Sequence, residues 1–213
     1  MSFNVLHPIK AKIYRQSLVI EHLITDYPSM RKEWNEKISL QLRQDAKSIA
    51  DGDLEIEREE YSKMLDCFLS SQEYDCVFYN SMLILVYAFY EDILTAIYAN
   101  EGYLVSGNLP PIKDLIKSKG ISLSVETQAN VDYLYNKVRI LRNAITHNTW
   151  KNKNIKSEYK DVITKLASHH NRIICDSESL YICKQDCLLC FLEKEKSVLL
   201  ELVDKLGYNK IHN

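Results

Sequence analysis

The chain has 213 residues, a formal net charge of -2, and 46% hydrophobic and 26% charged residues. This charge excludes a broadly basic nucleic-acid coat, so any contact with nucleic acid must rest on a local patch. With only 5 glycines and 4 prolines, long helices joined by few loops are favoured over a turn-rich β-sandwich.

The N-terminal third is predicted to form a helical arm. Residues 14–49 carry apolar residues at helical spacing, and Pro28 is expected to break or kink this helix because it lacks an amide hydrogen. A turn is predicted at Asp51-Gly52-Asp53, followed by a helix over residues 54–69. We expect residues 1–70 to be an arm on a core of residues 71–210, with residues 1–213 forming a single domain.

The core is predicted to be all-α, as an antiparallel helical bundle. Its central helix has an apolar stripe that is wide enough to be buried on most sides. Between the last two helices, residues 172–182 favour one short β-hairpin. The helices of the core are expected over residues 79–97, 112–119, 124–147, 156–170 and 185–206.

Two segments of the sequence bear on where the protein is located. Residues 1–12 lack an apolar core of the length that a signal peptide needs. The most apolar stretch, residues 77–99, is interrupted by Asn80, Glu91 and Asp92, which suit a buried helix better than a bilayer span. We therefore expect a cytoplasmic protein with no membrane partner.

The helix over residues 124–147 ends in the motif Arg142-Asn143-Ala144-Ile145-Thr146-His147. At about 3.6 residues per turn, Leu134, Val138, Leu141 and Ile145 form its buried seam. Arg142 is then expected beside the seam. Arg139, Asn143 and His147 are expected on the outward arc of the helix.

This polar surface has the groups that RNA cleavage needs. A histidine that titrates near neutral pH can accept or donate a proton, and His147 has the residue type for that role. An arginine such as Arg142 can hold a phosphate through paired hydrogen bonds. The ribose 2′-hydroxyl is an internal nucleophile, so neither a metal nor another cofactor is expected.

The flanks of the motif are locally basic, with seven lysines and arginines and one acid between Lys137 and Lys160. Such a patch in a mildly acidic chain is typical of phosphate contact. We expect Arg139, Lys151 and Lys153 to bind RNA and Trp150 to stack on an unpaired base. The alternative is a solvated basic face, with Trp150 packed against the protein.

Arg142-x4-His147, at the end of a late amphipathic helix, resembles the Arg-x(4–6)-His motif of the HEPN superfamily. The segment from Phe89 to Leu94 also resembles that family, with Glu91 at the position of an acidic residue. The resemblance implies that His147 is a general acid or base and that Arg142 binds and polarises the phosphate. It implies that Asn143 positions substrate or partner groups and that Glu91 holds Arg142.

The resemblance further implies a metal-independent endoribonuclease whose two protomers share one cleft. Its products would carry 2′,3′-cyclic phosphate and 5′-hydroxyl ends. Many relatives are toxins or antiviral defence effectors, so an antitoxin or a defence-system protein is an expected partner. The alternative is a non-catalytic helical module that binds a protein or a nucleic acid. Such modules often lack the motif arginine or histidine, whereas this chain has both.

Cysteine spacing offers a third reading. Cys183, Cys187 and Cys190 have the spacing of a radical-SAM iron–sulfur signature, but that signature belongs to a large α/β barrel that is not predicted here. The three cysteines are also expected on one helix face, where cysteine acts as a small hydrophobic residue. We therefore expect no metal site.

Overall fold

The computed structural model describes residues 6–68, 72–104, 110–148, 157–169, 173–175, 180–182 and 184–208. At some of these positions, including His147, only the backbone is described. The chain divides into two compact units, Met1–Ile24 with Tyr79–Asn213, and Thr25–Phe78. The start of the first helix belongs to the larger unit, and the expected single domain with an arm of residues 1–70 stays a prediction.

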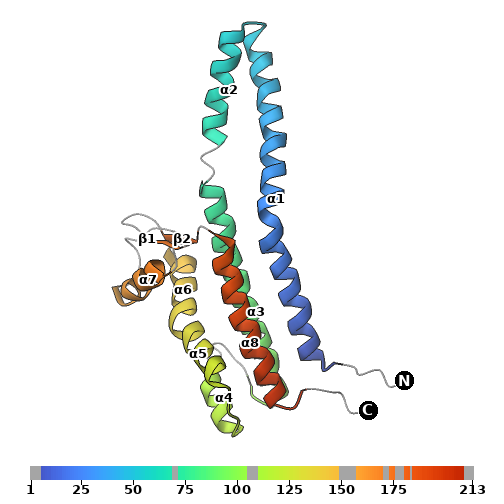
Figure 1. Ribbon diagram of the computed structural model, residues 1–213, viewed down its shortest axis with the longest axis vertical. Coiled ribbons are helices and arrows are strands. Elements are labelled where there is room, and N and C mark those ends of the chain that lie inside the picture. Colours follow the sequence, from blue (N-terminus) through green and yellow to red (C-terminus); the bar gives the residue numbers. More distant parts are fainter. Residues whose placement is uncertain are drawn as a thin grey trace, which may run out of the picture. The chain divides into compact units, whose positions relative to one another are not determined.

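The smaller unit contains parts of three helices: α1 (Pro8–Ala50), α2 (Leu54–Phe68) and the start of α3 (Gln72–Asn100). Helices α1 and α2 are antiparallel and meet at the predicted turn, where Asp51 and Gly52 have positive φ angles (Figure 1). We expected Pro28 to break or kink α1, but the helix continues through it. Side chains nearby are anchored on α3, since Tyr27 stacks on Phe78 with ring centroids 3.6 Å apart.

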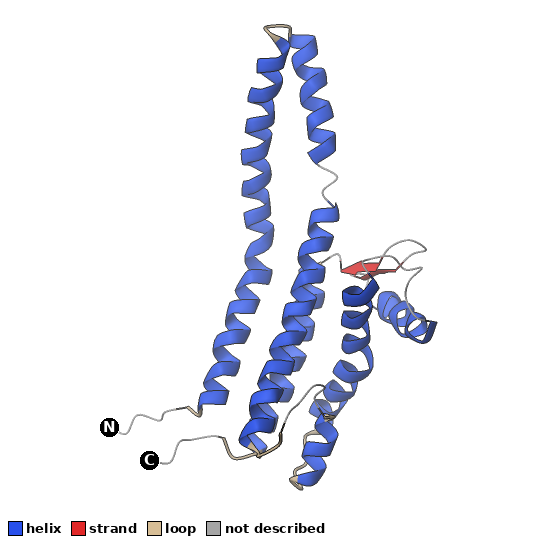
Figure 2. Ribbon diagram, turned by 180° about the vertical axis from the view of Figure 1, so that it is seen from behind, coloured by secondary structure: helices blue, strands red, loops and turns tan. Residues whose placement is uncertain are grey.

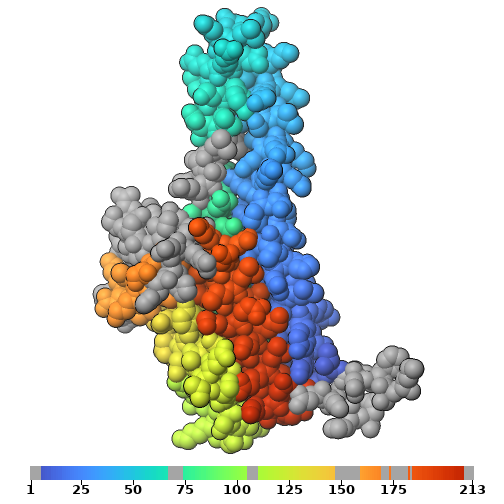
Figure 3. Space-filling view, viewed as in Figure 1, coloured from blue at the N-terminus to red at the C-terminus, as the bar shows by residue number. Residues whose placement is uncertain are grey.

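The larger unit contains most of α3 and all of α8 (Gln185–Lys205), and α8 lies in front of α3 in the view of Figure 1 and behind it in Figure 2. The segment α5 (Val125–Tyr133) packs against α8, and the two cover one face of this unit in Figure 3. Glu201 of α8 accepts hydrogen bonds from the Ser124 amide and hydroxyl at the start of α5. A short helix, α4 (Ile112–Ser118), precedes α5. These contacts hold α5, the segment that leads toward the motif, against α8.

The helix predicted over residues 124–147 is helical throughout but is not uniform. A π turn, Leu134–Val138, separates α5 from α6 (Arg139–Asn148), which carries the motif. A π turn contains an extra residue, so it shifts the rotational phase of everything that follows. The expected seam is nevertheless buried, because Leu134, Val138 and Leu141 have no exposed surface.

Beyond α6, the chain forms α7 (Ser157–His169) and two short strands. Strands β1 (Ile173–Cys175) and β2 (Leu180–Ile182) pair antiparallel, with Ile173 opposite Ile182, within the segment for which the sequence favoured a hairpin. The side-chain oxygen of Asn80, buried on α3, accepts a hydrogen bond from the Ile182 amide at 3.1 Å. The described residues are thus mostly helical, which confirms the all-α class.

Helix α3 is apolar enough over Tyr74–Asn100 to span a membrane by length and composition alone. Half of its most apolar stretch is buried inside the protein. Core helices of globular proteins pass the same test, so this finding is weak evidence for a membrane span.

Candidate functional site

Arg142 on α6 is held by two side chains. Its Nη2 donates a hydrogen bond to Oε2 of Glu91, a residue of α3, at 2.6 Å. Its Nη1 donates to Oδ1 of Asn143 at 2.8 Å. The contact with Glu91 is the one that the resemblance led us to expect. In the structure the side chain of Asn143 accepts a hydrogen bond from Arg142, and its expected role toward substrate or a partner stays a prediction.

The surroundings of Arg142 leave its charge partly accessible. Its guanidinium lies over the ring of Tyr87, with Cζ 5.1 Å from the ring centroid. The side chain is 24% exposed, while Nε is buried without a hydrogen-bond partner among the described residues. A guanidinium fixed in this way can present donors to an anion without losing further conformational freedom.

Arg139, one turn earlier, is not on a fully outward arc as expected. It is half-buried, and its guanidinium stacks on Tyr135 with Cζ 3.9 Å from the ring centroid. Asn143 is also half-buried, since its side chain turns toward Arg142. Both differences come from contacts within the helix, with Tyr135 for Arg139 and with Arg142 for Asn143. No carboxylate within the described part of the chain forms an ion pair with Arg139.

His147 is the penultimate residue of α6, and only its backbone is described. It follows Asn143 by one turn of the helix, so the two positions are surface neighbours. The other residues expected to contact RNA, Trp150, Lys151 and Lys153, lie outside the described residues. The structure thus brings together Arg142, Asn143 and Glu91, with Arg139 nearby on the same helix.

Two members of this neighbourhood were not expected from the sequence. Tyr87 lies under Arg142, and its pKa is raised by burial and by the nearby Glu91 carboxylate. Glu195 on α8 has no exposed surface, and burial raises the pKa of its carboxyl well above the ordinary value, with Glu91 adding to the effect. The burial of Glu195 could have been predicted from the sequence, because Glu195 falls on the apolar stripe of α8.

The cysteines do not gather into a metal site in the described ranges, which contain no group of three or more potential ligands. Cys187 is buried on α8 and Cys190 is half-buried, both as free thiols. Cys183 lies outside the described residues and precedes the first residue of α8.

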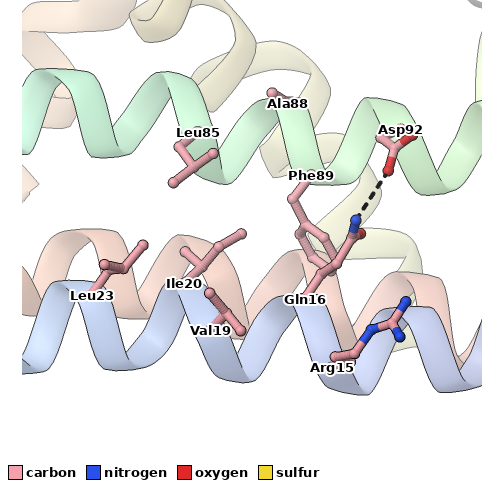
Figure 4. Close-up of a pocket in the computed structure, with 9 residues that line it drawn as sticks. All are labelled: Arg15, Gln16, Val19, Ile20, Leu23, Leu85, Ala88, Phe89 and Asp92. Carbon is pink, nitrogen blue, oxygen red and sulfur yellow. Dashed lines mark hydrogen bonds between the residues drawn. The ribbon is translucent and has the colours of Figure 1, made fainter.

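A groove of about 570 Å³ lies between α1 and α3 (Figure 4). Its polar edge is made by Gln16, whose Nε2 donates to Asp92 at 3.4 Å. The other residues that line it are Arg15, Val19, Ile20, Leu23, Leu85, Ala88 and Phe89.

The hold of Glu91 on Arg142 can be measured with a double-mutant cycle of Glu91→Gln and Arg142→Gln. We expect a coupling of about 0.5–1 kcal/mol in urea unfolding, because the two side chains are partly solvent-exposed at 40% and 24%. Added salt should weaken the coupling. The exposed Glu59–Lys63 pair of α2 is the matched control and should show less coupling. A coupling of zero for Glu91 and Arg142 would contradict the hold.

Comparisons of the chain with models of known protein families, with characterised proteins and with solved structures returned no match. The geometry of the site therefore carries the functional argument.

Proposed function

We propose that this chain is a HEPN-like, metal-independent endoribonuclease that acts in the cytoplasm. The observation that supports the proposal most strongly is the clamp on Arg142, formed by Glu91 at 2.6 Å and Asn143 at 2.8 Å. A guanidinium held from two sides, with part of its side chain exposed, suits a group that binds the phosphate of RNA.

The reaction needs one base, one acid and a stabilised phosphate. A base removes the proton of the ribose 2′-hydroxyl, the 2′-oxygen forms a bond to phosphorus, and the bond from phosphorus to the 5′-oxygen breaks. An acid donates a proton to the leaving 5′-oxygen, so the products have 2′,3′-cyclic phosphate and 5′-hydroxyl ends. His147 is the proposed proton-transfer group, and Arg142 stabilises the charge that develops on the phosphate.

The position of His147 supports this division of roles. It lies near the C-terminal end of α6, where the helix dipole favours the protonated imidazole. Asn143, one turn earlier on the same helix, accepts a hydrogen bond from Arg142. Arg139, with no carboxylate partner in the described structure, adds positive charge on the same helix.

We further propose that two copies pair so that both motifs face one cleft, and that the protein is a toxin or an antiviral defence effector. Light scattering on the purified chain should then give the mass of a dimer. A strict monomer at high concentration would contradict the shared cleft.

The nuclease activity is tested by incubating the purified chain with tRNA and mRNA transcripts in EDTA. We expect cleavage, and we expect His147→Ala to slow it by about 10²- to 10⁴-fold because proton transfer is lost. The control is His22→Ala, which alters an exposed histidine of α1 and should leave the rate unchanged. The product ends should accept a phosphate from polynucleotide kinase without prior treatment with phosphatase.

Two outcomes would contradict the proposal. If wild type and His147→Ala leave the RNA equally intact, the chain is not a nuclease. If cleavage requires Mg²⁺, the proposed mechanism is wrong even though the chain cuts RNA.

A further inference from the structure

Glu195 is a buried acid that the proposed reaction does not use. It lies on α8, its side chain has no exposed surface, and both carboxyl oxygens lack a hydrogen-bond partner among the described residues. Its neighbours along the helix, Phe191, Leu192, Val198 and Leu199, are all buried apolar residues. A carboxylate in this setting would be charged without compensation, which strongly favours the neutral acid.

The acid lies within electrostatic reach of Glu91, the carboxylate that accepts a hydrogen bond from Arg142. Burial is the main cause that raises the pKa of Glu195, and the Glu91 carboxylate is the second. The charges of Glu91, Arg139, Glu195 and Arg142 all act on the hydroxyl of Tyr87. On α3, the titratable groups near Glu195 are Tyr87, Tyr90 and Glu91, and on α6 the charged groups of this cluster are Arg139 and Arg142.

The net charge of this cluster depends on the proton of Glu195. Arg139 and Arg142 carry two positive charges and Glu91 carries one negative charge, so a neutral Glu195 leaves one positive charge in excess. If Glu195 were ionised, the cluster would be neutral. A change of one unit of charge near the motif alters how strongly the motif attracts a phosphate. The effect is larger than in water because part of the path between the charges runs through protein, whose effective dielectric constant is lower.

We propose that Glu195 is a positioning residue that holds a proton within electrostatic reach of Glu91, the partner of Arg142, and thereby keeps the motif helix one positive charge in excess for an RNA phosphate. The RNA part of this inference rests on the proposed function. The held proton does not, so the two parts are tested separately.

The proton is tested by urea unfolding of wild type and Glu195→Gln between pH 5 and pH 9. The pKa of Glu195 is raised in the folded state, so its stabilising contribution is complete below the pKa of the unfolded chain. That contribution is lost as the pH rises toward the folded pKa. Relative to Glu195→Gln, wild type should lose about tenfold in its folding equilibrium constant per pH unit over that interval. The control, Glu193→Gln, removes an exposed carboxylate of the same helix and should show no such trend.

A second measurement does not depend on the variant. Carbon NMR of the glutamate carboxyls in wild type should show one group that titrates well above the ordinary range. If every glutamate titrates in the ordinary range, the held proton is excluded.

The effect on phosphate is tested with a 2′-O-methyl oligonucleotide, which the proposed reaction cannot cleave. Fluorescence anisotropy at fixed ionic strength gives its Kd for wild type and Glu195→Gln from pH 6 to pH 9. Other groups titrate in both proteins, so the ratio of the two Kd values isolates Glu195. Once Glu195 ionises, we expect the Kd of wild type for the oligonucleotide to rise about three- to tenfold relative to the Kd of Glu195→Gln.

The outcomes separate the two proposals. A constant Kd ratio at every pH, alongside the expected pH trend in stability, would overturn the role of Glu195 toward phosphate. If wild type binds no oligonucleotide at any pH, the proposed function fails together with that role, while the trend in stability still decides whether Glu195 holds a proton.

Discussion

Replacing Arg142 by alanine is expected to slow RNA cleavage in EDTA by about 10²- to 10³-fold. This is the effect of removing one fixed donor from the charge that develops in a transition state. Arg142→Lys should be intermediate, because an ammonium keeps the charge but cannot donate to Glu91 and Asn143 in the planar geometry of a guanidinium. Single-turnover cleavage of a labelled RNA measures both rates.

The control for Arg142 is Arg58→Ala, which removes an exposed arginine of α2 and should leave the rate unchanged. The fold should survive Arg142→Ala, because the lost ion pair is partly exposed and its remaining partner, Glu91, can be hydrated. A folded Arg142→Ala protein that cleaves at the wild-type rate would rule out a role for the clamp in catalysis.

The largest loss of stability is expected from Leu134→Ala. Leu134 begins the π turn and has no exposed surface, so truncation leaves a cavity between the motif segment and the core. Buried leucine-to-alanine changes lower the free energy of unfolding by about 2–5 kcal/mol. Urea unfolding followed by circular dichroism should show this loss as a lower transition midpoint.

Leu104→Ala is the matched control, because the Leu104 side chain is fully exposed. The same chemical change there should alter the free energy of unfolding by no more than about 0.5 kcal/mol. If the two variants were equally stable, the packing of the π turn against the core would have to differ from the one described.

Much of the helical layout could be predicted because hydrophobic periodicity is local. The apolar seam through Leu134, Val138 and Leu141 is a repeat that any helix would bury, and it is buried here. The turn after α1 was predicted because Gly52 tolerates a positive φ angle. Pro28 does not break α1 although a proline removes one hydrogen bond, and nearby contacts such as Tyr27 on Phe78 come from a segment distant in the sequence.

The candidate site was predicted in part. The sequence motif and the position of Glu91 led to the contact with Arg142, which the structure contains. The role of Asn143 could not be predicted, because a side chain at an exposed helical position can turn toward solvent or toward its neighbour. The half-buried setting of Arg139 comes from its stacking on Tyr135, and the π turn that contains Tyr135 has no account in the sequence.

The sequence by itself determined the helical class, the motif from Arg142 to His147, and the apolar stripe of α8, since each depends on residue type and spacing along one chain. Only the tertiary structure decided what surrounds these features. It placed Glu91 against Arg142 and buried Glu195 within electrostatic reach of Glu91, with no hydrogen-bond partner in the described structure. The physical reason is that the energy of a charge depends on its solvent and its neighbours in space, and segments distant in sequence supply both.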